Sequence, residues 1–277
     1  MELKLMNFLT GFVLSGVLAM LIERKDVLTF GGMVTAIALG TIVYGLGGPV
    51  WMGVIFVFFV SSSALTNLFE KQKEKVNREQ FEKGGARDPW QVIANGGLAS
   101  VLAAAYFIWP DPLLFAAFLG VLATVNADTW ATEIGVLSKN VPRMVTTLKP
   151  VERGRSGGVS YLGLIASFVG ALFIGLSAAF LASAFQPALL LHIPWEKVVV
   201  LASLSGFLGA VVDSIIGATI QAQYYCGVCK KPTEQRTHHC GTRTVLKSGL
   251  WFVDNDTVNL LASIVGGIIA ALLFPFF

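Results

Sequence analysis

Charged side chains are scarce in this sequence, and their scarcity excludes an ordinary soluble domain. Only 13% of the 277 residues are Asp, Glu, Lys or Arg, whereas soluble globular proteins carry about 25%. The 20 Lys and Arg residues only slightly outnumber the 17 Asp and Glu residues, so no strong positive charge points to a nucleic-acid partner. We therefore expect membrane lipid to surround most of this chain.

Three further absences narrow the class of protein. The three cysteines all fall in one short loop, which gives no sign of a disulfide framework. No GxxxxGK[ST] pattern occurs, so nucleotide phosphates are not bound by a P-loop. The first apolar run, residues 6–22, has no clear small-residue cleavage site after it, and we expect a retained span rather than a cleaved signal peptide.

Long apolar runs dominate what is present. Each is long enough to cross the roughly 30 Å hydrocarbon core of a bilayer as a helix. They predict an all-α polytopic bundle of about eight transmembrane helices, which forms one integral-membrane domain over residues 1–277. The approximate bounds of the runs are 6–22, 28–46, 49–68, 91–109, 112–134, 158–184, 198–222 and 257–276.

The connections between these runs alternate in charge. Odd-numbered connections hold 18 of the 20 cations, and the positive-inside rule assigns such connections to the cytoplasm. The run Lys71–Lys83 alternates acidic and basic residues, which is typical of a solvated helix or loop. We therefore predict a protein of the cell membrane with both termini outside and cytoplasmic loops at about 69–90, 135–157 and 223–256.

Polar side chains gather near the predicted cytoplasmic ends of the spans. Asp128 and Asp213 interrupt the fifth and seventh apolar runs close to those ends. Carboxylates inside a membrane are costly and by default face a bundle interior or a water-filled cavity. The stretch Asn126–Ser160 contributes the largest share of these groups, so we expect a functional site to be organised around it.

The last four spans contain a faint internal repeat. LIASFVGA at 164–171 resembles LLASIVGG at 260–267, and Phe-Leu-Gly precedes both Asp128 and Asp213. Two repeated helical hairpins with a site between them are one interpretation. The small-residue patterns that recur in any packed membrane helix explain the similarity equally well.

A glycine-rich stretch, GRSGGVS at 154–160, opens the sixth apolar run. Backbone N–H groups that glycines leave free at a helix N-terminus bind anions. Arg143 and Lys149 lie close by in the sequence and favour phosphate as the anion. The alternative is that the glycines serve helix packing and the cations contact anionic lipids. The candidate phosphate ligands in the stretch are Arg155, Ser156, Gly157, Gly158 and Ser160.

Three aspartates are candidate Mg²⁺ ligands, because this ion takes one or two protein carboxylates together with phosphate oxygens and water. Asp128, Asp213 and Asp256 come from three different spans. Helix capping is the alternative role for Asp256. Glu133 lies about 140° round the helix from Asp128, so we expect it to face another direction.

The last predicted cytoplasmic loop carries a zinc-type ligand set, Cys226, Cys229, His239 and Cys240. Four protein ligands leave no open position on the metal, so any Zn²⁺ here is expected to be structural. Reduced thiols without a metal are the alternative.

Taken together, the motifs resemble an integral-membrane family that contains plant phytyl-phosphate kinase and animal transmembrane protein 19. The resemblance covers essentially the whole chain. It implies transfer of a phosphoryl group from a nucleoside triphosphate, with CTP the expected donor, to a prenyl or phytyl monophosphate. The segments that carry it include RDPWQVIANGG (87–97), NADTWATEIG (126–135), RSGGVS (155–160), DSIIGATIQA (213–222) and DNDTVN (254–259).

On this hypothesis the polar residues have separate tasks. The acceptor phosphate is already anionic, so no general base is required, and catalysis depends on positioning and charge neutralisation. The expected catalytic residues are Asp128, Lys149, Arg143 and Asp213. The amides expected to orient the phosphates are Asn95, Asn126 and Asn259.

Two other functions stay open at this point: an ion- or proton-coupled transporter, and a protein that binds a phosphate-bearing lipid or anionic solute without chemistry. A transporter needs a polar lining across the whole membrane, whereas an enzyme of this kind needs one at a single face. The sequence does not indicate an oligomeric state.

Overall fold

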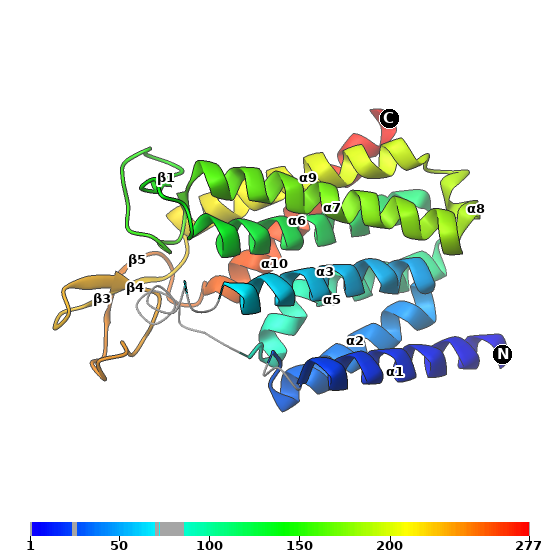
Figure 1. The fold of residues 1–277 in the computed structure, drawn as a ribbon, viewed down its shortest axis with the longest axis horizontal. Helices are drawn as coiled ribbons and strands as arrows, with labels where there is room; N and C mark the ends of the chain where they lie inside the picture. Colours follow the sequence, from blue (N-terminus) through cyan, green and yellow to red (C-terminus); the bar gives the residue numbers. More distant parts are fainter. Residues whose placement is uncertain (1, 24–26, 70–71, 73–85, 277) are drawn as a thin grey trace.

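The computed structural model is a bundle of long helices with a small β-containing cap at one end (Figure 1). It describes residues 2–23, 27–69, 72 and 86–276. The long helices follow the predicted apolar runs to within a few residues at each end. They are α1 (Glu2–Glu23), α2 (Phe30–Gly47), α3 (Pro49–Leu68), α5 (Pro89–Ile108), α6 (Pro112–Gly135), α7 (Tyr161–Phe185), α9 (Trp195–Thr219) and α10 (Asn255–Leu273).

The helical membrane bundle is confirmed by the length and hydropathy of these elements. Seven of the described helices are long and apolar enough to cross a membrane, and α1 adds a shorter apolar segment at Leu5–Met20. The short elements α8 (Pro187–Leu190) and η1 (Phe274–Phe276) follow α7 and α10. The Lys71–Lys83 run and most of the predicted loop at 69–90 lie outside the described residues.

Local sequence signals fix where several helices begin. Proline opens α3, α5 and α6, where its missing N–H costs nothing. Asp88 caps α5 by accepting from Gln91 N at 2.9 Å, and the Gln91 side chain accepts from Asp88 N at 3.1 Å. This capping box fixes the start of α5 at Pro89, and with it the position of Arg87 just before the helix.

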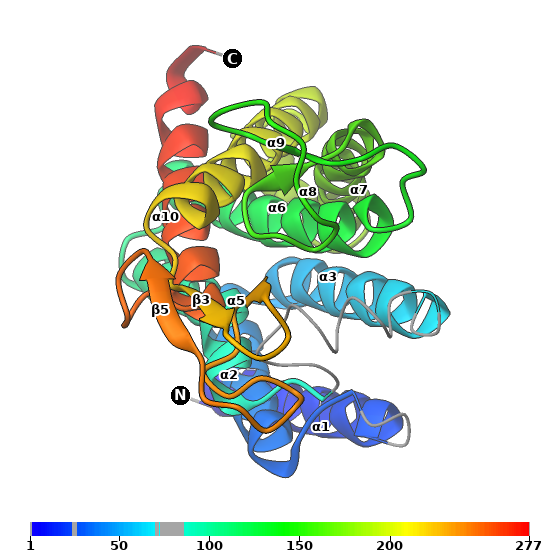
Figure 2. The same ribbon diagram turned by 90° about the vertical axis from the view of Figure 1, so that its left-hand side faces the viewer.

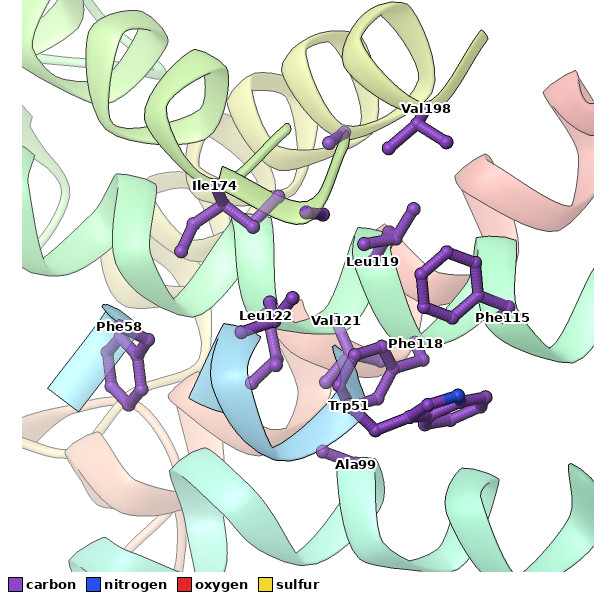
Figure 3. Close-up of a cluster of buried hydrophobic side chains, with 14 of the residues drawn as sticks. Trp51, Phe58, Ala99, Phe115, Phe118, Leu119, Val121, Leu122, Ile174 and Val198 are labelled. Carbon is purple, nitrogen blue, oxygen red and sulfur yellow. The ribbon is translucent and has the colours of Figure 1, made fainter. Parts of the chain in front are cut away.

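Helix α6 lies at the centre of the bundle. In its most apolar stretch 72% of the residues are buried, whereas no other span exceeds 44%. Its aromatic side chains pack on Trp51 of α3, with ring centroids 4.3 Å from Phe118 and 5.3 Å from Phe115. Figure 3 shows this cluster between α3 and α6. A polar group on α6 is therefore surrounded by other helices.

Small residues let α9 and α10 approach α6 closely. A methyl group added to Gly209 of α9 or to Gly266 of α10 would overlap the Thr124 side chain of α6. Both glycines lie in the segments of the predicted repeat, so the repeated pattern coincides with a real packing contact. This packing brings Asp213 and Asn259 alongside Asp128.

The cap consists of two small antiparallel sheets. Strands β1 (Arg143–Met144) and β2 (Gly158–Val159) pair with each other. Strands β3 (Gln223–Cys226), β4 (Lys231–Thr233) and β5 (Val245–Ser248) form a sheet of order β4-β3-β5. The cap lies at the end of the bundle opposite to both termini (Figures 1 and 2). The prediction that the odd-numbered connections lie on the side opposite to both termini agrees with this arrangement. The assignment of the cap end to the cytoplasm stays a prediction.

Candidate functional site

A polar cavity of about 290 Å³ opens at the cap end of the bundle. Its walls come from the ends of six long helices, the glycine-rich stretch before α7, and the loops that follow α9 and β4. The cavity therefore brings together segments that are far apart in the sequence. The predicted site residues that line it are Asn95, Asp128, Arg155, Ser156, Gly157, Gly158, Ser160, Asp213 and Asn259.

Two carboxylates meet on one wall. Asp128 of α6 and Asp213 of α9 both line the cavity, and their carboxyl groups lie close enough to interact. Two neighbouring carboxylates repel each other unless a proton or a cation lies between them. The negative charge of Glu234, from the loop after β4, also acts on Asp213. The wall is thus suited to hold a positive ion.

Several buried polar atoms in the cavity have no hydrogen-bond partner in the described part of the chain. Such atoms are uncommon in folded proteins, and each one calls for a partner such as water, an ion or a ligand. Among these atoms are three oxygens, Asp213 Oδ2, Asn95 Oδ1 and Asn259 Oδ1, and one guanidinium nitrogen, Arg155 Nε. The cavity thus offers both acceptors for a cation and a donor for an anion.

The glycine-rich stretch forms a tight wall against α9. Gly154 and Gly157 have φ values of 77° and 74°, in the left-handed region that favours glycine. A Cβ on Gly157 would come within 2.7 Å of the Ala218 Cα atom. Ser160 caps α7 by accepting from Gly163 N at 3.1 Å. The stretch thus lies at a helix N-terminus, as an anion site requires.

A hydrogen-bonded group joins this stretch to the three-stranded sheet. Ser156 Oγ donates to Glu234 Oε1 and accepts from Gln223 Nε2 at 3.0 Å. Gln223 and Glu234 are 7% exposed. The sheet therefore covers part of the cavity.

Other predicted site residues lie elsewhere. Arg143 donates to Leu148 O at 2.8 Å, and it and Lys149 are exposed on the β1–β2 hairpin, outside the cavity lining. Their contacts with phosphate stay predictions, which require the hairpin to move toward the cavity. Asp256 is also outside the lining. The alternative role of capping falls to Asp254, which accepts from Thr257 N at 2.9 Å.

Asn126 holds helices together and does not line the cavity. It is fully buried in α6. Its Oδ1 accepts from Ser61 Oγ of α3 at 3.1 Å, and its Nδ2 donates to Gly170 O of α7 at 2.7 Å. The amide thus ties three helices together beside the cavity, and its predicted role in orienting phosphates has no counterpart in these contacts.

A second, apolar cavity of about 90 Å³ adjoins the polar one. It lies among α1, α2, α3 and α5 and is lined mostly by hydrocarbon, including Leu39, Ile55 and Phe59. Arg87 and Asn95 line both cavities. The guanidinium carbon of Arg87 lies 5.4 Å from the ring centroid of Phe59, and burial lowers the Arg87 pKa to about 10. A cation thus marks the junction of the two cavities.

The cysteine loop brings together three of the four predicted metal ligands, and a different histidine supplies the fourth. Cys226, Cys229 and Cys240 cluster with His238, and their ligand atoms lie within 4.8 Å of one another. His238 takes the place that we assigned to His239, because the turn after β4 buries the His238 ring and leaves His239 exposed. The predicted ligand set is corrected accordingly.

Comparison with known proteins agrees with this architecture. The family described as "Integral membrane protein DUF92" matches residues 13–267. The chain belongs to this family. The family resemblance predicted from the motifs is thereby confirmed.

Relatives of this DUF92 chain occur in plants and archaea. Protein PGR of Arabidopsis thaliana is 33% identical over 268 residues, which cover 90% of both chains. Uncharacterized membrane protein MJ0933 of Methanocaldococcus jannaschii is 26% identical over 98% of this chain and 95% of that protein. Protein VTE6, chloroplastic, of Arabidopsis thaliana is 27% identical over 90% of this chain and 66% of that protein. No solved structure matches the chain.

Sequence reasoning gave no role to three charged cavity residues in this DUF92 protein. Arg87 lies in the segment 87–97 that carries the family resemblance, but no function was assigned to it. Glu133 had been set aside by its helical angle, but the cavity spans a wide face of α6, and Glu133 Oε1 accepts from Thr66 Oγ1 at 2.9 Å. Glu234 gave no local signal, since only the folding of the sheet over the bundle brings it to Ser156.

Proposed function

We propose that this DUF92 protein transfers a phosphoryl group from a nucleoside triphosphate to an isoprenoid monophosphate at the membrane surface. The observation that carries the proposal is the junction of the two cavities at Arg87 and Asn95. A substrate with a phosphate head and a hydrocarbon tail matches a polar cavity joined to an apolar one. A small soluble anion has no use for the apolar cavity.

The apolar cavity accommodates the part of the chain nearest the head group. Its volume of about 90 Å³ is far below the roughly 300–1,000 Å³ of a site that encloses a whole drug-sized ligand. The remainder of a prenyl or phytyl chain would therefore lie in the bilayer. This division avoids extracting the tail from lipid, which costs about 0.8 kcal/mol per CH₂.

The polar cavity positions the reacting phosphates. An oxygen of the acceptor monophosphate attacks the terminal phosphorus of the donor, and the bond from that phosphorus to the nucleoside diphosphate breaks. The products are an isoprenoid diphosphate and a nucleoside diphosphate. Arg87 and Arg155 bind the phosphate oxygens, and Gly157 and Gly158 supply backbone N–H groups. No proton has to be removed from the acceptor, so the reaction depends on alignment and charge.

The oxygen-rich wall fits a hard divalent cation. Asp128 and Asp213 would hold Mg²⁺, with Asn259 Oδ1 close by as a neutral oxygen donor, a set that suits this ion. When bound, Mg²⁺ supplies charge neutralisation for the donor phosphates. CTP is the donor that the family resemblance implies.

The position of the polar lining supports an enzyme over a transporter. Every lining residue in the described part of the chain belongs to the cap end of its helix or to the cap itself, such as residues 128–135 of α6 and 255–259 of α10. A transport path needs polar groups through the other half of the bundle as well.

The test uses the purified full chain in lipid nanodiscs. It is incubated with Mg²⁺, with CTP or ATP, and with geranyl, farnesyl, geranylgeranyl or phytyl monophosphate, and diphosphate formation is followed by mass spectrometry. We expect turnover with at least one pairing and none after Asp128→Asn. Folded protein that forms no diphosphate from any pairing overturns the proposal, and phosphate-dependent solute uptake into proteoliposomes would support the transporter instead.

A further inference from the structure

The cysteine loop has the geometry of a metal site. Cys226 Sγ lies 3.6 Å from Cys240 Sγ, and His238 Nδ1 lies 3.3 Å from Cys240 Sγ. Tetrahedral coordination with Zn–S near 2.3 Å and Zn–N near 2.0–2.1 Å separates two sulfurs by about 3.8 Å and a sulfur from a nitrogen by about 3.6 Å. These two separations are close to the tetrahedral values, and all four ligand atoms lie within 4.8 Å of one another, as one Zn²⁺ requires.

Two turns present the ligands in pairs. Cys226 ends β3, and the turn into β4 brings Cys229 back toward it, so that Cys229 N donates to Cys226 Sγ at 3.4 Å. The second turn joins His238 to Cys240, with His238 N donating to Thr242 O at 3.0 Å. A backbone N–H directed at a ligand sulfur is a usual outer-shell contact of a metal–thiolate centre.

The loop has little else to hold it together. Between residues 223 and 250 the buried side chains are Gln223, Cys226, Thr233, Glu234 and His238. Cys226 is the one apolar side chain among them, and every residue of β5 is exposed. A disulfide or a structural metal is a common way to stabilise a small sheet that has no hydrophobic core of its own. The three cysteines form no disulfide, so a metal is the device of this kind that they can supply.

The same sheet reaches the polar cavity. Gln223 begins β3, the strand that ends in Cys226, and Glu234 directly follows β4. Both side chains bond Ser156 of the glycine-rich stretch. A metal that holds Cys226 at the end of β3 would therefore also hold Gln223 and Glu234, the side chains that close the cavity.

We propose that Cys226, Cys229, His238 and Cys240 bind one structural Zn²⁺, which holds the three-stranded sheet over the polar cavity. Three thiolates and one imidazole are a soft donor set that selects zinc over Mg²⁺. All four positions are occupied by protein, so the ion has no part in chemistry. Its effect on the cavity passes through Gln223 and Glu234.

Metal analysis of the full chain tests the site without reference to activity. Protein expressed in zinc-supplemented medium is measured by elemental mass spectrometry, and we expect one Zn²⁺ per chain. His238→Ala should lose the ion and the neighbouring His239→Ala should keep it. Folded wild-type protein without stoichiometric zinc, protein with iron in its place, or zinc that depends on His239 and not His238 overturns the site.

Cobalt exchange removes the risk that a variant simply misfolds. Wild-type protein in which Co²⁺ replaces the ion should show the absorption of tetrahedral cobalt with sulfur ligands. Octahedral cobalt, or bands without sulfur-to-cobalt charge transfer, contradicts the assigned ligands.

The link to the cavity has its own measurement. Hydrogen exchange is compared before and after removal of the ion by a chelator. We expect faster exchange in residues 154–160 as well as in 223–248, with the centre of α6 unchanged as a control. If only the sheet loosens, zinc does not hold the cavity wall. None of these measurements depends on kinase activity. A failed test of the zinc site would therefore leave the proposed function intact, and a failed test of the proposed function would leave the zinc site intact.

Discussion

The carboxyl groups of Asp128 of α6 and Asp213 of α9 both line the polar cavity and lie close enough to interact with each other. The two residues are 85 positions apart in the sequence, and the close packing of α9 on α6 at Gly209 and Thr124 brings them together. Like charges at this separation destabilise a protein unless a cation or a proton lies between them. The pair thus combines a cost to stability with a capacity to bind metal.

Replacing either carboxylate should separate these two effects. We expect Asp213→Asn or Asp128→Asn to lower phosphoryl transfer by about 100-fold or more and to abolish Mn²⁺ binding followed by electron paramagnetic resonance. Without divalent metal the variants should unfold at the same temperature as wild type or higher, because repulsion is relieved. Asp111→Asn is the control, since it lies at the other end of α6 and asparagine caps a helix equally well. Loss of metal binding in that control would argue against a local site.

Gly157 is the glycine on which the anion site depends most. Gly157→Ala places a side chain at φ 74°, which costs about 1–2 kcal/mol, and also pushes the stretch away from Ala218. We expect lower thermal stability and at least a tenfold higher KM for the phosphate substrates. Gly16→Ala in α1 has open space around its Cβ and should leave both quantities unchanged. Equal effects of the two substitutions would mean that the stretch is not a phosphate site.

The buried guanidinium of Arg87 predicts a pH dependence in a variant. Burial lowers the Arg87 pKa from 12.5 to about 10, so the wild-type side chain is cationic throughout the neutral range. The same burial would lower the pKa of a lysine below its ordinary value of about 10.4 and toward the neutral range. Because a cation loses its charge as pH rises through its pKa, Arg87→Lys should show a KM for the acceptor phosphate that increases from pH 7 to 9. The wild-type KM should stay flat over that range, and parallel profiles would place Arg87 away from the phosphate.

The apolar cavity should accept the part of the chain nearest the head group. Ala36 lines it, whereas Ala38 on the same helix α2 is exposed and lies outside its lining. Ala36→Phe should therefore reduce kcat/KM several-fold for isoprenoid monophosphates of every chain length. Ala38→Phe should leave kcat/KM unchanged. An unchanged kcat/KM in both variants would show that the chain binds elsewhere.

The sequence was most informative where a signal is local. Hydropathy located the eight long helices because each span must be apolar along its own length. The glycine-rich stretch 154–160 predicts an anion-binding turn at a helix N-terminus, and it directly precedes α7, with Gly154 and Gly157 at positive φ. Asp128 and Asp213 could be paired because each interrupts an apolar run near the same end of the bundle.

The remaining features depend on contacts between distant segments. Glu234 reaches the cavity only through the fold of the three-stranded sheet, and the choice of His238 over His239 follows from which ring the second turn buries. The sequence places Arg87 at the start of the fourth span, but only its backbone hydrogen bonds with Val27 and Thr29 show that it lies at the junction of two cavities. Helical periodicity misplaced Glu133, because the cavity is wider than one helix face.

Asn126 has a consequence for how the protein assembles. Its amide is satisfied only when α3 supplies Ser61 and α7 supplies Gly170, and an amide left bare in hydrocarbon costs several kcal/mol. A chain inserted only as far as α6 therefore carries an unmet polar group in the bilayer until α7 arrives. The insertion of α7 thus removes the free-energy cost of one unsatisfied amide, that of Asn126. Intermediates inserted only as far as α6 should therefore be the species most exposed to degradation.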